Sequence, residues 1–135
     1  MKQKVTLCLT KDGTFTLTAD RNINDLNPKE LLLCSAAECA GLTLYGILQK
    51  EHIRPLKLEI TVAGELNTDT VMGRSVFTSF HVGYNVECRA ISEQAKIGRA
   101  INLATEKYCG LIQMLRQIAP LSHEVSIMSV ETVEA

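Results

Sequence analysis

The segment from Leu31 to Leu48 most limits what this chain can fold into, because it is predicted to be a helix with almost no polar face. Its clearly polar side chains are Ser35, Glu38 and Thr43. A helix that is apolar all round has to be covered on every side, either by protein or by lipid. Glu38 falls at its midpoint, and several alanines and glycines dilute its hydrophobicity, so we interpret it as a buried core helix and not as a membrane span.

Local signals mark where this helix begins and ends. Asn27 is a favourable N-cap, Pro28 suits the first helical position, and Glu30 follows the cap at the spacing of a capping box. The Arg-Pro pair at 54–55 is expected to close the helix, because the residue before a proline is disfavoured in helical geometry. We therefore predict a helix from Pro28 to about residue 50.

A chain of 135 residues has too little material to wrap such a helix completely. We expect one domain, residues 1–135, and an obligate homodimer in which a second copy covers what the first leaves open. The alternating apolar pattern of the strands predicted on both sides of the helix favours a water-soluble fold without a membrane partner.

The remaining segments are predicted to form strands and two shorter helices. The expected elements are a hairpin over 5–19, strands over 56–62 and 76–86, helices over 92–109 and 111–118, and a last strand over 125–133. Ser92 is a candidate cap for the second helix, and Val76 and Tyr108 are placed on buried faces. The order ββ-α-ββ-αα-β is typical of an α+β domain.

The composition describes a globular chain and counts against nucleic acid as a partner. Hydrophobic residues make up 46% and charged residues 21%, and the net charge is −1, whereas phosphate binding needs a surplus of Lys and Arg. Aromatic residues make up only 4%, so few side chains could stack on the bases of single-stranded nucleic acid. The apolar stretch near the N-terminus is interrupted by Thr6 and stopped by Lys11, so no targeting peptide is expected and a cytoplasmic location is predicted.

Metal and nucleotide sites are not expected. The sequence has no Cys-x-x-Cys, no His-x-x-x-His and no Gly-x-Gly-x-x-Gly pattern, so we predict neither a metal nor an organic cofactor. A Ser-His-Asp arrangement stays open, although no nucleophile-elbow motif points to one.

Five cysteines in a chain with no predicted export signal are expected to rest as thiols. Cys39 has small neighbours that leave room for a ligand. Cys109 lies where two helices meet, and a thiol at a helix start gains thiolate character from the helix dipole. We interpret Cys34 as core packing. From the residues alone, Cys39 and Cys109 are either a redox pair or structural thiols.

Three stretches of the sequence carry a family resemblance. Asn-Pro-Lys-Glu-Leu-Leu-Leu at 27–33, Ala-Ala-Glu-Cys-Ala at 36–40 and Glu-Lys-Tyr-Cys at 106–109 resemble the OsmC/Ohr family, the osmotically inducible protein C and organic hydroperoxide resistance proteins. The similarity extends over nearly the whole chain. It implies a swapped homodimer in which two central helices are wrapped by sheets from both chains.

The resemblance also implies thiol-dependent reduction of organic hydroperoxides. By position, Cys39 would be the peroxidatic thiolate and Cys109 the resolving thiol, and an external dithiol would reduce the disulfide that they form. Such a mechanism needs no metal or organic cofactor.

The sequence departs from the peroxidase pattern of this family in the groups that support the thiolate. Lys29 stands where those members carry a Glu, with Glu30 one residue along, and Arg21 is the candidate for their Arg. Glu30 and Arg21 also have simpler interpretations, as part of the capping box and as a surface charge. Glu38 beside Cys39 would disfavour a thiolate if it faced the pocket.

Two alternatives to the peroxidase hypothesis follow from these departures. One is a non-catalytic dimer of the same fold, used as a small-molecule-binding or structural protein, in which Cys39 reacts sluggishly. The other is different sulfur chemistry, through a persulfide on Cys39, which the sequence alone does not distinguish.

Overall fold

A computed structural model describes residues 1–67 and 74–130. The elements in chain order are β1 (Lys2–Leu9), β2 (Phe15–Leu17), α1 (Pro28–Lys50), β3 (Lys57–Leu66), β4 (Phe77–Cys88), α2 (Gln94–Leu103), a π-helical turn (Ala104–Tyr108), α3 (Gly110–Ile118) and β5 (Leu121–Ser129). The α+β order predicted from the sequence is confirmed.

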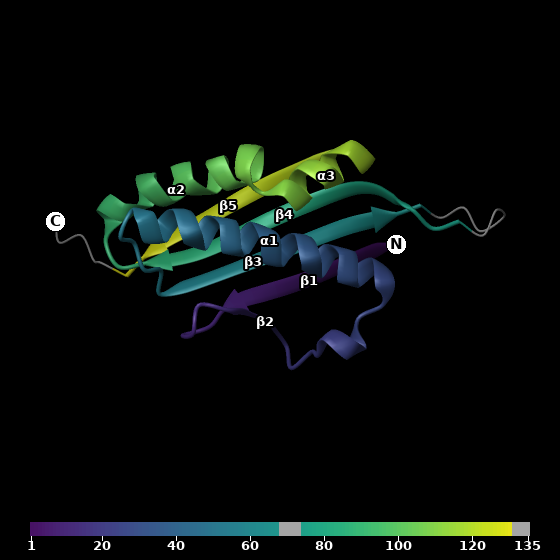
Figure 1. The fold of residues 1–135 in the computed structure, drawn as a ribbon, viewed down its shortest axis with the longest axis horizontal. Coiled ribbons are helices and arrows are strands. Elements are labelled where there is room, and N and C mark those ends of the chain that lie inside the picture. Colours follow the sequence, from purple (N-terminus) through teal and green to yellow (C-terminus); the bar gives the residue numbers. More distant parts are fainter. Residues whose placement is uncertain (68–73, 131–135) are drawn as a thin grey trace.

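The described strands form one five-stranded sheet in the order β2-β1-β3-β4-β5. All neighbouring pairs are antiparallel except β4 and β5, which are parallel. A parallel pair needs a long crossover, and here α2, the π turn and α3 provide it. The three helices lie over one face of the sheet, with α1 packed on β1 and β3, α2 packed on β5 and α3 against β4 (Figure 1).

The alternating apolar residues of the two central strands form the sheet side of the core. The side chains that they bury are Leu58, Ile60 and Val62 from β3 and Phe80, Val82, Tyr84 and Val86 from β4. Each of these residues follows the previous one in its strand by two positions, so they point to the same face, toward the helices.

The cap that the sequence predicts at the start of α1 is present. The side chain of Asn27 accepts a hydrogen bond of 2.8 Å from the backbone N–H of Glu30, whose carboxylate accepts one of 3.0 Å from the backbone N–H of Asn27. The helix ends at Lys50, a few residues before the Arg-Pro pair at 54–55. The end is set by His52, whose φ of 58° is left-handed and incompatible with another helical turn.

A single copy of the chain does not cover α1 all round. One side of the helix is buried on the sheet, whereas Leu31, Ser35, Glu38 and Leu42 form an exposed stripe three to four residues apart. By length and composition α1 could cross a membrane, but its packing on β1 and β3 is that of the core helix of a soluble fold.

Two placements in the strands differ from the expectation. Val76 is 53% exposed and Phe77 is buried instead. The pairing of β3 with β4 shifts between Glu65, which pairs with Ser79, and Leu66, which pairs with Phe77. Thr78 is therefore an extra residue on β4, and the side chains before it alternate in the opposite register from those after it. The last strand begins at Leu121, earlier than expected, and the predicted stretch 131–133 lies outside the described residues.

Two placements in the second helix also differ. Ser92 lies inside a 3₁₀ turn, Ile91–Glu93, that precedes α2, so it does not cap the helix. Tyr108 is 56% exposed, because the residues from Ala104 onward form a π turn whose wider spacing rotates the following side chains away from the α-helical face.

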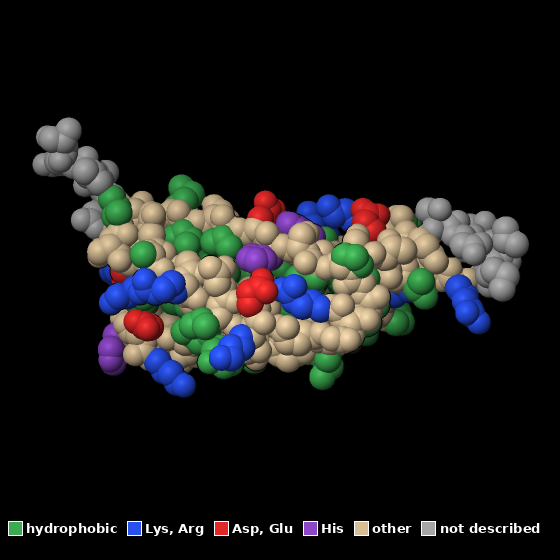
Figure 2. Space-filling view, turned by 90° about the horizontal axis from the view of Figure 1, so that it is seen from above, with side chains coloured by type: hydrophobic (Ala, Val, Ile, Leu, Met, Phe, Trp, Pro, Cys, Tyr) green, Lys and Arg blue, Asp and Glu red, His purple; other side chains and the backbone are tan. Residues whose placement is uncertain are grey.

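The surface carries charges of both signs. In the space-filling view of Figure 2, basic and acidic side chains are interspersed with hydrophobic and neutral ones. This mixed face agrees with the net charge of −1.

Candidate functional site

Cys39 and Cys109 are seventy residues apart in the sequence but meet in the structure. Cys39 lies in the middle of α1, and Cys109 lies at the junction between the π turn and α3, both of which pack against α1. The Cys39 thiol lies close enough to Cys109 to raise its pKa, and both cysteines are free thiols.

Cys109 is completely buried at the start of α3. Burial raises the pKa of its thiol, the neighbouring Cys39 thiol raises it further, and the backbone N–H groups of Ile112 and Leu111 act in the opposite direction. The expectation that the helix start would give Cys109 net thiolate character is therefore wrong. The backbone N–H groups at the start of α3 do favour the thiolate, but the loss of solvation outweighs their effect.

Cys39 is half-buried and lines a surface hollow of about 460 Å³. The other lining residues are Ile23, Leu31, Cys34, Ser35, Glu38, Leu42, Thr43 and Leu111. Four of them carry large aliphatic side chains, and Glu38 is the charged member. An apolar molecule in this hollow would therefore lie against Cys39, whereas Cys109 is buried and is not among the lining residues.

Arg21 and Glu30 form an ion pair at the start of α1. Nη2 of Arg21 lies 2.7 Å from Oε2 of Glu30, and both side chains are mostly buried. The hydrogen bond from Arg21, and next that from the backbone of Asn27, hold the pKa of the Glu30 carboxyl below its usual range. Glu30 thus completes the capping box and meets Arg21 at the same time, whereas Lys29 is half-buried beside it.

The positive charge of Arg21 lies near Cys34. Burial and the charge of Glu38 raise the pKa of the Cys34 thiol, and Arg21 acts to lower it. Arg21 lines a second hollow, which shares Ile23, Cys34 and Glu38 with the hollow of Cys39. Cys34 itself is buried in the core, as expected.

A buried polar cluster that sequence reasoning missed lies behind Cys109. The hydroxyl of Thr105 is 2.7 Å from the backbone carbonyl of Ile101 and 2.7 Å from the hydroxyl of Tyr84 on β4. Burial, opposed by the hydrogen bond with Thr105 and reinforced by the nearby Cys109, raises the pKa of Tyr84 to about 12. The sequence held one signal for this cluster. Thr105 follows the apolar Ile101 by four residues and so lies on the same, buried face of the predicted helix.

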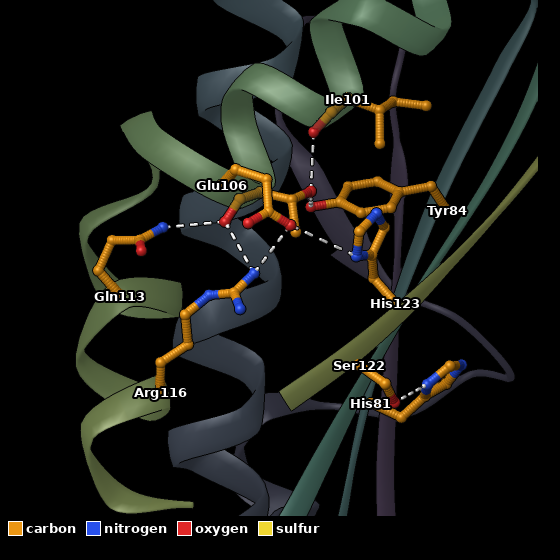
Figure 3. A network of polar contacts seen from close by, with 9 residues as sticks. His81, Tyr84, Ile101, Glu106, Gln113, Arg116, Ser122 and His123 are labelled. Carbon is orange, nitrogen blue, oxygen red and sulfur yellow. Dashed lines mark hydrogen bonds and ion pairs between the residues drawn. The ribbon is translucent and has the colours of Figure 1, made fainter. Parts of the chain in front are cut away.

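Side chains from α3 extend this cluster. Gln113 and Arg116 donate to the backbone carbonyl of Thr105 at 2.9 and 3.4 Å, and Arg116 also lies 3.2 Å from Glu106 (Figure 3). Nδ1 of His123, on β5, is 3.8 Å from the same carboxylate. The residues that flank Cys109 are therefore tied both to α3 and to the sheet.

Cys8 and Cys88 do not line the hollow of Cys39. Cys8 is half-buried on β1, and Cys88 is buried at the end of β4. Among residues 1–67 and 74–130, no three His, Cys, Asp or Glu side chains gather in a way that could hold a metal ion.

Comparison with known proteins gives the same family over most of the chain. The family described as OsmC-like protein matches residues 19–124. Protein YhfA of Escherichia coli (strain K12) is 25% identical over 103 residues, which cover 76% of this chain and 74% of YhfA.

Solved structures share the fold. The OsmC-like protein from Mycoplasma pneumoniae matches with a TM-score of 0.63 and 17% identity, covering 95% of this chain and 96% of its own. The organic hydroperoxide resistance protein OhrB of Bacillus subtilis matches with a TM-score of 0.56 and 17% identity, covering 93% of this chain and 98% of its own. Together with the family match over residues 19–124, these findings show that the chain belongs to the OsmC-like protein family.

Proposed function

We propose that this protein reduces organic hydroperoxides to alcohols with a pair of thiols, Cys39 and Cys109. The observation that carries the proposal is the nearness of the two cysteines: Cys39 lines a largely aliphatic hollow on α1, and Cys109 is buried at the start of α3, which packs against α1. The naming of OhrB, a structural relative, as an organic hydroperoxide resistance protein supports the same substrate class.

In the first step, the sulfur of Cys39 attacks the outer oxygen of the hydroperoxide. The O–O bond breaks, the alkoxide leaves and takes a proton to become the alcohol, and Cys39 becomes a sulfenic acid. The aliphatic lining of the hollow, from Leu31, Leu42 and Leu111, holds the organic part of the substrate.

In the second step, the sulfur of Cys109 attacks the sulfur of the oxidised Cys39. A disulfide forms, and the sulfenic hydroxyl leaves as water with the proton of the Cys109 thiol. An external dithiol then reduces the disulfide by two thiol exchanges and is itself oxidised to a disulfide. Burial raises the pKa of Cys109, so this thiol loses its proton as it attacks the sulfenic acid.

Arg21 and Glu30 take a supporting role in this proposal. Their ion pair is neutral as a whole, but Arg21 and not Glu30 lines the second hollow, which adjoins the hollow of Cys39. The guanidinium therefore partly offsets the charge of Glu38, which both hollows share and which would otherwise disfavour negative charge on the reacting groups.

A swapped homodimer in the cytoplasm is part of the same proposal. The exposed stripe of α1 contains Leu31 and Leu42, and neighbouring elements expose Ile23, Tyr108 and Met114 at 56–61%. Large apolar side chains gathered on one side of a domain are typical of a surface that another protein covers. Light scattering after size exclusion should give twice the chain mass of 14.9 kDa, and a single-chain mass would refute the dimer.

The activity is tested by steady-state turnover of cumene hydroperoxide with dithiothreitol as reductant. Wild-type protein and the matched control Cys8→Ser should consume peroxide at similar rates, whereas Cys39→Ser should fall to the uncatalysed rate. Equal rates for wild type and Cys39→Ser would remove Cys39 from the mechanism.

A second candidate function is a non-catalytic dimer that binds apolar small molecules in the hollow of Cys39. It is favoured by the position of Arg21. In a peroxidase this Arg would be expected to stabilise the Cys39 thiolate, but here its positive charge acts on the thiol of Cys34. This candidate predicts that wild-type protein exposed to cumene hydroperoxide gives no sulfenic acid that dimedone can trap. Trapping on Cys39 would contradict it.

A further inference from the structure

The backbone around Cys109 is irregular and has to be held by contacts from outside its own turn. The residues before it form the π turn, whose last bond joins the N–H of Cys109 to the carbonyl of Ala104 at 2.8 Å. Cys109 itself is extended, with φ −81° and ψ 106°, and α3 starts directly after it. Carbonyl groups in the last turn of a helix have no partner within that helix, so other groups must satisfy them.

Gln113 supplies hydrogen bonds on both sides of Cys109. Its side-chain amide donates to the carbonyl of Thr105, four residues before Cys109, at 2.9 Å. Its backbone N–H donates to the carbonyl of Cys109 at 3.2 Å. One residue of α3 therefore joins the end of the π turn to the start of the next helix, with Cys109 between them.

The carbonyl that receives this bond is itself anchored. Thr105 is completely buried, and its hydroxyl joins Ile101 and Tyr84. Arg116 donates to the same carbonyl at 3.4 Å and is held by Glu106 (Figure 3). Hydrogen bonds therefore connect the backbone next to Cys109 to the sheet through Tyr84 and to α3 through Gln113.

We infer that Gln113 is a positioning residue, which holds Cys109 where its sulfur can bridge to Cys39. The inference rests on the proposed function for its biological meaning, because bridging is the second step of that reaction. Gln113 acts through the backbone of Cys109 and touches neither the substrate nor the reacting sulfurs in this role. A disulfide requires its two residues to be placed within narrow limits, so a small displacement of Cys109 would slow its formation.

The experiment measures bridging separately from peroxide chemistry. Diamide oxidises two neighbouring thiols to a disulfide and is reduced to the hydrazine, so its reaction with the reduced protein reports how readily Cys39 and Cys109 meet. Gln113→Leu removes the side-chain donor, and Gln113→Glu replaces it with an acceptor of the same length. Gln117→Leu is the matched control, because Gln117 is exposed on the same helix.

Both Gln113 variants should form the Cys39–Cys109 disulfide about tenfold more slowly than wild type, while Gln117→Leu keeps the wild-type rate. With cumene hydroperoxide and dimedone, the Gln113 variants should accumulate trapped sulfenic acid on Cys39, which a general loss of structure would not produce. Far-UV circular dichroism checks that each variant is folded.

The inference is overturned if a folded Gln113 variant bridges at the wild-type rate, or if Gln117→Leu slows bridging as much. The proposed function fails in a different way, when wild-type protein bridges with diamide but does not consume hydroperoxide.

Discussion

Oε2 of Glu30 accepts a hydrogen bond of 2.7 Å from Nη2 of Arg21, while the other carboxylate oxygen accepts one of 3.0 Å from the backbone N–H of Asn27. One carboxylate thus joins the segment that follows β2 to the first turn of α1. Both bonds favour the charged form and lower the pKa of Glu30, the Arg21 bond more strongly.

The stabilisation from Glu30 should disappear in acid. Because the pKa of Glu30 is lower in the folded than in the unfolded protein, its contribution is complete above the unfolded value of about 4.3 and is lost as the pH falls through the folded value. We expect Glu30→Gln to lower the free energy of unfolding by about 1 kcal/mol at neutral pH and much less in strong acid. Urea unfolding measures both values. Glu51→Gln, at an exposed position, is the control, and an equal loss at both pH values would contradict the prediction.

Replacing Cys109 should stop the proposed reaction after its first step. Cys109→Ser leaves the Cys39 sulfur at its hollow but removes the thiol that condenses with the sulfenic acid. One equivalent of cumene hydroperoxide should therefore add oxygen to Cys39 without forming a disulfide, and mass spectrometry of the peptides distinguishes the two products. Disulfide formation to another cysteine at the wild-type rate would show that Cys109 is not the resolving thiol.

The hydroxyl of Thr105 should contribute strongly to stability. Thr105→Val leaves the buried hydroxyl of Tyr84 without this partner, which should cost about 1–3 kcal/mol. Tyr84→Phe should cost less, because Thr105 keeps its bond to the carbonyl of Ile101. A double-mutant cycle measured by urea unfolding isolates the coupling, and additive effects would show that the two hydroxyls do not support each other.

Two glycines of α1 should respond in opposite directions to alanine. A Cβ atom at Gly41 would lie 2.6 Å from Cζ of Phe15 and 3.0 Å from Cδ1 of Ile60, so Gly41→Ala should destabilise the protein by about 1–3 kcal/mol. A Cβ atom at Gly46 would meet no described atom within 4 Å, so Gly46→Ala should stabilise by up to about 1 kcal/mol through helix propensity. Thermal unfolding compares them, and destabilisation by both would indicate that a further contact covers Gly46.

Elements that depend on neighbouring residues were predicted well. The start of α1 follows from Asn27, Pro28 and Glu30, which interact within one helical turn. The positions of the strands along the chain follow from their alternating apolar residues, because each strand buries one of its two faces. The placements of Val76 and Tyr108 were wrong, because a bulge and a π turn each change the face to which neighbouring side chains point, and the spacing of apolar residues in the sequence does not reveal either irregularity.

Only some residues of the candidate site could be predicted from the sequence. Cys39 and Cys109 could be proposed from the resemblance of their motifs, and Arg21 and Glu30 as companions, but the polar cluster of Thr105, Gln113 and Arg116 could not. The hydrogen bonds of that cluster join residues that the irregular backbone around Cys109 brings together, and no spacing rule for regular helices anticipates them.

The sequence by itself determined the element order and the helix α1 with its cap, because those features depend on interactions among residues a few positions apart. Only the tertiary structure decided that Cys109 lies beside Cys39 and that burial raises the pKa of the Cys109 thiol. The physical reason is that a contact across seventy residues, and the loss of water around a sulfur, are set by how the helices pack on the sheet and by nothing in the local sequence.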